Sequence, residues 1–442
     1  MWETFHPPVH QYRQISVAEI AGRFRAILFT AGPEIAPCEA AEYRRAAGLG
    51  AFALQRVVDF LDGIHGQNLA LAGTKSKTDC ACVAIVRVPK KDLRTARMNP
   101  DPERGGGQVL VDLALQGGGA HGAFTWGVLD RLLDEPWLCI EGISGTSAGA
   151  MNAAILVDGY AEGGAEAAKA RLELFWQSVS RAALLSPFRR TPLDVMLGRW
   201  TIDTSPIFIA FDLAARIFSP YDLNPRGANP LREILAECID FKRVANAAIK
   251  LFVTATNVRT GRGRVFHNAE LTPDVLLASA CLPTLFQAIE IDGEAYWDGG
   301  YAGNPTITRL VRECISSDTI LVQVNPVDRP GTPRSAREIL NRINEVSFNA
   351  PLLKELRMIA VLQQASDPGH SEGARWAKMR IHRIASEIMT ELGYSSKLNA
   401  EWDFLCMLRD EGRRSAEAFL TAHTADLGVR STFDVAALGE LS

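Results

Sequence analysis

The pentapeptide Gly145-Thr146-Ser147-Ala148-Gly149 lies between an apolar run, Trp137 to Ile143, and a segment of small and apolar residues, Ala150 to Leu156. A strand, a tight Gly-x-Ser-x-Gly turn and a helix, in this order, are the sequence form of a nucleophile elbow. The glycines let the backbone turn sharply, and the N-terminus of the following helix favours negative charge near Ser147. The pentapeptide alone does not distinguish an elbow from an ordinary turn, so the flanking sequence decides.

Two strand–loop–helix units surround this turn. The apolar segment Val109–Leu115 precedes the glycine-rich loop Gly117–Gly122 and an amphipathic helix, Ala123–Leu133. The second strand, Leu138–Ile143, leads through the pentapeptide into another helix. Strands that are apolar on both faces are typical of parallel sheets with helices on both sides. The sequence therefore predicts an α/β fold with right-handed crossovers.

The character of the chain changes near residue 107. Residues 1–107 carry no motif with a chemical role and end in a stretch rich in Pro and Gly, which is typical of a linker. We expect an accessory N-terminal segment here, and one hypothesis is that Met98 is the natural start of the chain. Residues 108–326 form the expected catalytic domain. Residues 327–442 are predicted to be a mainly helical C-terminal extension with a short strand at Met379–Ile384.

Composition excludes several classes of protein. Of the 442 residues, 47% are hydrophobic and 22% charged, as in an ordinary globular protein, and the net charge of -4 gives no reason to expect a nucleic-acid partner. No apolar run is long enough for a membrane-spanning helix, and the N-terminus lacks the pattern of a signal peptide. Eight scattered cysteines indicate free thiols in a reducing cytoplasm. Cys80-x-Cys82 has no second ligand pair nearby, so we expect no metal site.

The glycine-rich loop admits two interpretations. Gly117-x-Gly119-x-x-Gly122 follows a strand, opens a helix and has Glu141 nineteen residues further on, which matches the dinucleotide-binding fingerprint. The successive glycines equally offer backbone N–H groups for an oxyanion hole. Glu141 is followed at once by the Gly-x-Ser-x-Gly turn, which the end of a ribose-binding strand does not require. Dinucleotide binding therefore stays the alternative, and the oxyanion hole is the preferred interpretation.

Asp298-Gly299-Gly300 follows a turn at Gly293. An Asp before two glycines is most often only a turn residue. Its place after an elbow serine and an oxyanion-type loop gives it a second interpretation, because a serine hydroxyl is a weak nucleophile and needs a base within hydrogen-bond reach. The Asp298 carboxylate is our candidate for that base.

The three motifs together, Gly-Gly-Gly-Ala-His-Gly (117–122), Gly-Thr-Ser-Ala-Gly (145–149) and Asp-Gly-Gly (298–300), resemble those of the patatin-like phospholipase family. The resemblance covers about Leu113 to Val324. It implies a three-layer α/β/α fold with a mainly parallel central sheet, and lipid acyl hydrolysis by a Ser–Asp dyad that needs no histidine, cofactor or metal. By match of motif, Ser147 corresponds to the nucleophile and Asp298 to its base. The backbone amides that correspond to the oxyanion hole are those of Gly117, Gly118, Gly119 and Ala120.

Two positions depart from the commonest pattern of the family. His121 stands where the glycine loop often has Arg or Lys, and Gly300 stands where Ala is frequent. His121 has three interpretations: a side chain that supports the turn or faces solvent, a contact for an anion or head group, or a general base. The positions that we expect to support the motifs are His121, Gly122, Gly145, Gly149, Gly299 and Gly300.

The substrate is predicted only as a class, a lipid or another ester with a long acyl chain. Such an ester needs an apolar channel, which the aromatic-rich region 183–221 would line, and the same region would provide peripheral contact with a membrane. The alternative is that its aromatic residues, Phe188 and Trp200 among them, are ordinary packing. A further alternative keeps the fold but makes the protein a lipid-binding regulatory module with little turnover. The sequence does not predict an oligomeric state.

Overall fold

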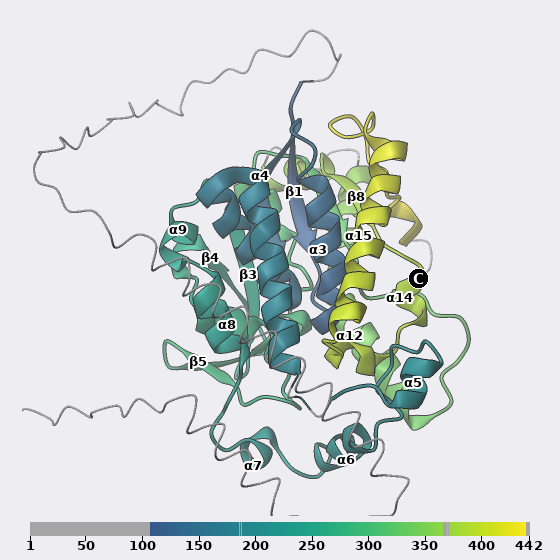
Figure 1. Ribbon diagram of the computed structural model, residues 1–442. Coiled ribbons are helices and arrows are strands. Elements are labelled where there is room, and N and C mark those ends of the chain that lie inside the picture. The colour runs from purple at the N-terminus through teal and green to yellow at the C-terminus, as the bar shows by residue number, and fades with distance from the viewer. Residues whose placement is uncertain (1–106, 185, 187, 366–368, 370, 439–442) are drawn as a thin grey trace, which may run out of the picture. The chain divides into compact units, whose positions relative to one another are not determined.

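The computed structural model describes residues 107–184, 186, 188–365, 369 and 371–438. All of them lie in one compact unit, Ala96–Ser442. The expected N-terminal accessory segment and the hypothetical start at Met98 lie outside the described residues. Within the described part of the chain, the central element is an eight-stranded sheet in the order β5-β6-β3-β2-β1-β7-β8, with β4 paired to β3 (Figure 1).

Parallel strands form the centre of the sheet, and an antiparallel group extends one side. The parallel strands are β3 (Lys250–Asn257), β2 (Leu138–Gly145), β1 (Val109–Leu115), β7 (Asp318–Val322) and β8 (Arg380–Ile384). The antiparallel strands are β4 (Gly263–His267), β6 (Glu294–Asp298) and β5 (Ile289–Ile291). The predicted mainly parallel sheet is confirmed, and the short strand expected at Met379–Ile384 is its edge strand β8.

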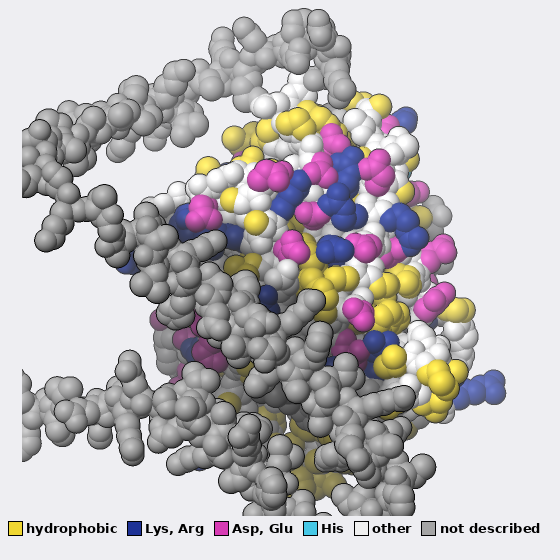
Figure 2. Space-filling view, viewed as in Figure 1, with side chains coloured by type: hydrophobic (Ala, Val, Ile, Leu, Met, Phe, Trp, Pro, Cys, Tyr) yellow, Lys and Arg dark blue, Asp and Glu magenta, His cyan; other side chains and the backbone are white. Residues whose placement is uncertain are grey.

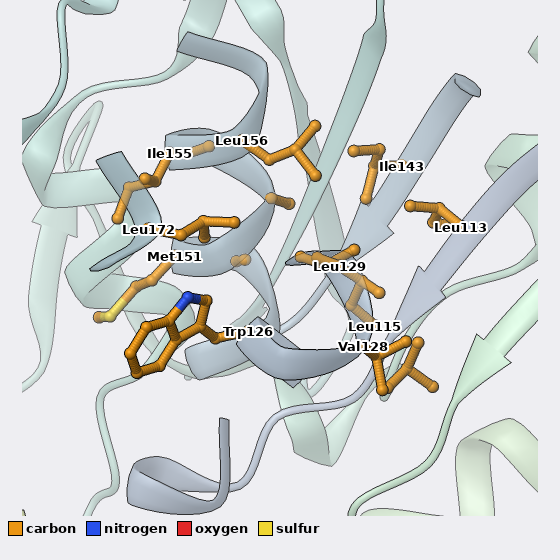
Figure 3. Close-up of a cluster of buried hydrophobic side chains, with 14 of the residues drawn as sticks. Leu113, Leu115, Trp126, Val128, Leu129, Ile143, Met151, Ile155, Leu156 and Leu172 are labelled. Atoms are coloured by element: carbon orange, nitrogen blue, oxygen red, sulfur yellow. The ribbon is translucent and has the colours of Figure 1, made fainter. Parts of the chain in front are cut away.

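Three helices that lie side by side in Figure 1 cover one face of the sheet: α3 (Gly122–Leu132), α4 (Ala148–Ala183) and α15 (Trp402–His423). Side chains of a strand alternate between the two faces of a sheet, and Leu113 and Leu115 of β1 point to this one. Figure 3 shows them with Ile143 of β2, next to Leu129 of α3 and Ile155 of α4, all of them buried. Burial of each such side chain contributes about 1.5–3 kcal/mol, so this cluster holds the helices on the sheet.

The opposite face is covered by three other helices: α11 (Thr308–Glu313), α12 (Ala336–Gln364) and α13 (Glu372–Ala377). Ala114, which alternates with the two leucines of β1, is buried in a second cluster with Leu321 of β7 and Leu352 of α12. Pro351 lies inside α12 without ending it, so this segment is one long helix. The sheet and its two helical layers make the predicted three-layer α/β/α fold.

Shorter helices connect these layers. They are α5 (Pro192–Met196), α6 (Pro206–Ala214), α7 (Pro220–Leu223), α8 (Leu231–Cys238), α9 (Phe241–Ala245), α10 (Pro273–Ser279) and α14 (Ile388–Glu391). The 3₁₀ turns are Gly119–His121, Asn268–Glu270, Gly299–Tyr301, Tyr394–Leu398 and Ala436–Leu438. α5 and α7 each begin at a proline behind a capping box, formed by Thr191 with Asp194 and by Ser219 with Asp222. These caps explain why helices form in a region rich in Pro and aromatic residues.

Residues beyond 326 contribute to the same layers as the preceding part of the chain. β8 pairs in parallel with β7, where Arg380 lies opposite Asp318, and α15 packs against α3. The two helices approach closely where Gly412 of α15 faces the backbone carbonyl of Phe124. Any side chain at position 412 would collide with that carbonyl, so the close approach requires glycine.

We expect Gly412→Val to destabilise the protein by about 3 kcal/mol, because the added side chain meets the backbone of α3 and forces the two helices apart. Ala418→Val is the matched control, since Ala418 is exposed on the same helix and bears only the cost of a β-branched residue in a helix. Chemical denaturation of both variants checks the expectation. Equal free energies of unfolding would mean that α15 does not need its contact with α3.

The outer surface of α3 and α15 carries side chains of both charges, which Figure 2 shows interspersed. Ion pairs link the two helices across this surface, among them Arg131 with Glu417 and Arg413 with Asp130. Exposed pairs of this kind typically contribute less than about 1 kcal/mol each, so they add little to the apolar packing beneath. None of the described helices is long and apolar enough to cross a bilayer.

Candidate active site

Ser147 lies at a sharp turn between β2 and α4. Its backbone has φ 55° and ψ -125°, a conformation that residues with a side chain rarely adopt. Its hydroxyl group makes no capping hydrogen bond to α4 and stays available for other contacts. Gly149 lets the first turn of α4 approach β1, because a Cβ there would collide with the carbonyl of Leu115. The turn has the geometry of a nucleophile elbow.

Ser279 holds this turn from behind. The backbone N–H of Ser147 donates a 2.9 Å hydrogen bond to the hydroxyl of Ser279. That hydroxyl in turn donates a 2.7 Å bond to the backbone carbonyl of Thr254 in β3. The elbow is thereby tied to the neighbouring strand through the end of α10. Sequence reasoning missed Ser279, because a single serine at the end of an apolar helix has no pattern that marks it.

Asp298 ends β6 and is buried, with 1% of its surface exposed. The sheet register places it opposite Ala255, two residues beyond the β3 residue that pairs with the end of β2. Its Oδ1 accepts a 2.8 Å hydrogen bond from the Gly300 amide. Burial raises the pKa of Asp298 to about 7, while hydrogen bonds with that amide and with the Ser147 side chain act in the opposite direction. The carboxyl and hydroxyl groups are therefore in contact in a dry environment.

The glycine loop borders the same cavity as Ser147 and Asp298, through Gly118 and Gly119. Gly119 has φ 58°, in the left-handed region that favours glycine. It also packs so closely on the backbone of Lys397 that a Cβ would lie 2.5 Å from the carbonyl oxygen. Both properties require glycine at position 119, where the loop borders the cavity together with Ser147.

Polar side chains from distant parts of the chain hold the base of the glycine loop. The Gly117 amide donates a 2.7 Å hydrogen bond to Oδ1 of Asn304, and the Gly117 carbonyl accepts one of 2.7 Å from Asn325. Oε1 of Gln116 accepts bonds of 3.0 and 2.9 Å from the amides of Val324 and Asn325. Of the four amides assigned to the oxyanion hole, that of Gly117 is thus already engaged within the protein.

The other motif residues lie at the ends of the elements around this site. They are Ala120, buried in the first 3₁₀ turn, Gly122 at the start of α3, Gly145 at the end of β2, and Gly299 and Gly300 in the turn after β6. Every motif position thus flanks the cavity or supports a turn beside it.

His121 is buried, with 2% of its surface exposed, so it does not face solvent. Its Nε2 forms a 2.8 Å hydrogen bond with the hydroxyl of Ser396, and its Nδ1 has no hydrogen-bond partner among the described residues. Burial, together with the charges of Lys397 and Arg329, lowers the pKa of His121 well below its ordinary value, so the ring is neutral. The ring joins the glycine loop to Ser396 and makes no hydrogen bond with Ser147.

A cavity of about 280 Å³ opens beside Ser147. Its walls are mostly apolar and include Phe208 and Phe211 of α6, Leu285 after α10, and Phe348 of α12. Walls that are mostly apolar match a hydrocarbon chain, and the polar side chains among them include Ser147 and Asp298. The arrangement suits an acyl group whose ester carbonyl lies at Ser147.

Two aromatic residues of the region 183–221 do not line this cavity. Phe188 packs edge-on against Phe211, with 4.8 Å between ring centroids. Trp200 packs on Phe404 at 5.2 Å, with the guanidinium of Arg190 over its ring. These two rings pack within the protein, whereas the aromatic residues of α6 in the same region reach the cavity.

A second cluster of ionisable side chains lies between β1, β2 and the end of α11. Ligand-type atoms of Asp112, Glu141 and Cys314 lie within 4.8 Å of one another. The Glu141 carboxylate already accepts a 2.8 Å hydrogen bond from Lys250 and two more from backbone amides of the following loop. Burial raises the pKa of Asp112 to about 8, so this carboxyl is mostly neutral at pH 7. Glu141 is therefore engaged and does not offer the free carboxylate that ribose binding requires.

A family model matches the part of the chain that holds the three motifs. Residues 113–311 match the family model described as patatin-like phospholipase. Among solved structures, the chain is similar to the crystal structure of VipD from Legionella pneumophila, with 16% sequence identity and a TM-score of 0.33 over 72% of this chain and 67% of that one. No curated protein matches the sequence significantly. The residues matched by the family model include the glycine loop, the serine elbow and Asp298.

Proposed function

We propose that residues 113–311, which form a patatin-like phospholipase domain, hydrolyse carboxylic esters of phospholipids or related lipids through an acyl-serine intermediate. The match to the family model supports a lipid hydrolase in general, and the Ser–Asp dyad and the ester substrate are the finer part of the proposal. The observation that carries the proposal is the contact of the buried Asp298 with Ser147 in a cavity whose walls are mostly apolar.

In the proposed reaction, Asp298 accepts the proton of the Ser147 hydroxyl, and the serine oxygen attacks the ester carbonyl. The amides of Gly118 and Gly119 stabilise the charge that develops on the carbonyl oxygen, and losing one such donor typically costs about 10²–10³ in rate. The bond to the alcohol then breaks, and the alcohol leaves with the proton from Asp298. Water, deprotonated by Asp298, attacks the acyl-serine and releases the fatty acid and free Ser147.

Burial suits Asp298 to the role of base. A general base works best when its pKa lies near the working pH, and burial brings the pKa of Asp298 to about 7. At this pH the group is ionised in a large fraction of molecules and still binds a proton readily. A histidine is therefore not needed to bridge the serine and the carboxylate.

Mass spectrometry of the protein after fluorophosphonate labelling tests this function. The adduct should lie on Ser147, and the unlabelled protein should release fatty acid from phospholipid–detergent micelles. An adduct on another serine contradicts the assignment. Labelling of Ser147 without turnover of phospholipids, glycerides or acyl thioesters favours the lipid-binding module instead.

We also propose a cytoplasmic location. The cysteines of the described residues are free thiols, most of them buried: Cys139, Cys238, Cys281, Cys314 and Cys406. Free thiols are typical of reducing compartments.

We further propose that α5, α6 and α7 contact a lipid surface. α6 turns Phe208 and Phe211 into the cavity, while Ile207 and Leu213 of the same helix are exposed. Figure 2 shows hydrophobic side chains at the position of α5, where Met196 is 76% exposed. Other exposed apolar side chains of this segment are Leu193, Val195, Leu197, Ile217, Phe218 and Tyr221. An apolar surface beside the cavity would let a lipid ester pass from a bilayer to Ser147.

The double replacement Ile207→Ser/Ile217→Ser is expected to weaken binding to phospholipid vesicles about tenfold or more, because each side chain loses apolar surface that would be buried in the bilayer. Ile315→Ser/Val429→Ser is the matched control. These two side chains are 84% and 71% exposed, against 55% and 77% for Ile207 and Ile217, but they lie near the amino ends of β7 and β1 and do not line the cavity. Vesicle sedimentation checks this, and equal weakening in both pairs would remove α5–α7 as the contact surface.

A further inference from the structure

Lys397 is a partly buried cation in the active-site cavity. It belongs to the 3₁₀ turn Tyr394–Leu398, beyond the residues that the family model matches, and lines the cavity together with Ser147 and Asp298. Its ammonium group donates a 2.7 Å hydrogen bond to Oδ1 of Asn325. Burial lowers the pKa of Lys397 to about 8, so the side chain is mostly charged at neutral pH.

The turn that carries Lys397 is fastened to the glycine loop. Ser396 forms the 2.8 Å hydrogen bond with His121, and the carbonyl of Lys397 lies against Gly119. On the other side, the hydroxyl of Ser395 accepts a 3.3 Å bond from the amide of Ile202. The backbone of the turn is therefore fixed beside the glycine loop, and the bond to Asn325 fixes the ammonium group at the end of the side chain.

The charge of Lys397 has no direct counter-ion among the side chains that the structure describes. Glu345, the acidic group with the largest effect on its pKa, is already bound by Arg329 at 2.8 Å and by Arg342 at 3.3 Å. Asp298 also acts on the pKa of Lys397, but its carboxyl group is engaged with the Gly300 amide and Ser147. An ammonium group has three donors. The bond to Asn325 uses one, and the only other contact of the group among the described residues is the Tyr394 ring, 5.8 Å away at its centroid, so two donors have no hydrogen-bond acceptor within this part of the protein.

We propose that Lys397 binds the anionic phosphate group of the substrate, so that the site prefers charged phospholipid esters to neutral glycerides with the same acyl chain. Charge-assisted hydrogen bonds to phosphate are the strong ones, and they gain further when the site excludes water. The carboxylate of a released fatty acid offers the same charge and acceptor atoms, so the test must separate the two anions. This inference rests on the proposed function and makes Lys397 its specificity-determining residue.

The test compares two palmitoyl esters in the same detergent micelles, lysophosphatidylglycerol and monoacylglycerol. For Lys397→Met we expect kcat/KM to fall about 10- to 100-fold on the phospholipid and to stay close to wild type on the glyceride. Lys397→Arg keeps the charge and should keep the preference. Lys354→Met, which removes an exposed lysine of α12, is the matched control and should change neither value.

The pH dependence of the selectivity can be measured on the wild-type protein, so this second test does not depend on the folding of a variant. As the pH rises through about 8, Lys397 loses its charge, so the ratio of kcat/KM for the two esters should decline. Any effect of pH on Asp298 acts on both esters and cancels in that ratio. A ratio that stays constant from pH 7 to pH 10 would contradict the proposal.

Other outcomes separate this inference from the proposed function. Equal losses on both esters in Lys397→Met would mean that Lys397 acts through Asp298 or the fold, and would overturn the inference. An unchanged ratio combined with weaker inhibition by palmitate would assign Lys397 to the product carboxylate and overturn it as well. An active Lys397→Met variant with unchanged selectivity contradicts this inference alone. A wild-type protein that hydrolyses neither ester contradicts the proposed function and, with it, this inference.

Discussion

Asp298→Asn is expected to lower ester hydrolysis by about 10⁴-fold or more, because the side chain keeps its shape and loses the group that takes the Ser147 proton. The amide oxygen of Asn still accepts the hydrogen bond from the Gly300 amide, so the turn after β6 is preserved. Values of kcat/KM on a soluble ester measure the loss. A variant that keeps a tenth of the wild-type activity would remove Asp298 as the base.

Asp292→Asn provides the matched control for this replacement. Asp292 is exposed in the turn between β5 and β6 and pairs with Arg264 at 2.9 Å. It belongs to the same hairpin as Asp298 and undergoes the same chemical change, so it should leave kcat/KM unchanged. The difference between the two variants isolates the contribution of the carboxylate at the site.

The same replacement of Asp298 is expected to stabilise the fold at alkaline pH. Burial raises the pKa of Asp298 from 3.8 to about 7, so between these values the folded protein binds a proton that the unfolded chain has lost. The contribution of this group to stability therefore decreases as the pH rises from about 4 to about 7. Asn carries no such cost, and the variant should exceed the wild type in free energy of unfolding by about 4 kcal/mol at pH 8 and match it near pH 4.

The pH dependence of catalysis follows from the same group. Only the ionised carboxylate accepts the serine proton, so the wild-type kcat/KM on a neutral ester should rise with pH and level off above a midpoint near 7. The residual activity of Asp298→Asn should lack this rise. A midpoint near 4 would mean that the pKa of Asp298 in the free enzyme is not raised by burial.

Ser147→Ala is expected to abolish fluorophosphonate labelling and to lower hydrolysis by about 10⁶-fold, to background. The replacement removes the oxygen that we propose as the nucleophile and keeps Cβ, so the backbone of the elbow should not change. Labelling gels and single-turnover assays with a chromogenic ester measure the two effects. Persistent labelling of the variant would assign the nucleophile to another residue.

His121→Gln is the contrasting variant for this experiment. The His121 ring is bonded to Ser396 and not to Ser147, so labelling should remain and the loss of activity should be small beside that of Ser147→Ala. A loss as large as that of Ser147→Ala would indicate a histidine base and contradict the Ser–Asp dyad.

The layers of the fold were predictable because they follow from local patterns. Val109–Leu115 is apolar on both faces apart from Asp112, which is typical of a strand covered by helices on both sides, and the structure has β1 at these bounds. The strand at the C-terminal end of the chain was also visible in its alternation. Its partner in the sheet could not be predicted, because the alternation within β8 contains no information about the neighbouring strand, β7. The close contact of Gly412 with α3 has no pattern either, since glycine serves many purposes.

By itself, the sequence determined the chemical groups of the candidate site and their order, since the glycine loop, Ser147 and Asp298 each lie in a short motif. Only the tertiary structure decided which of them meet and what they are surrounded by. The contact of Asp298 with Ser147, the neutral state of His121 and the position of Lys397 in the cavity all depend on residues far apart in the chain. Burial and electrostatic effects arise from such long-range packing, and a linear pattern does not contain them.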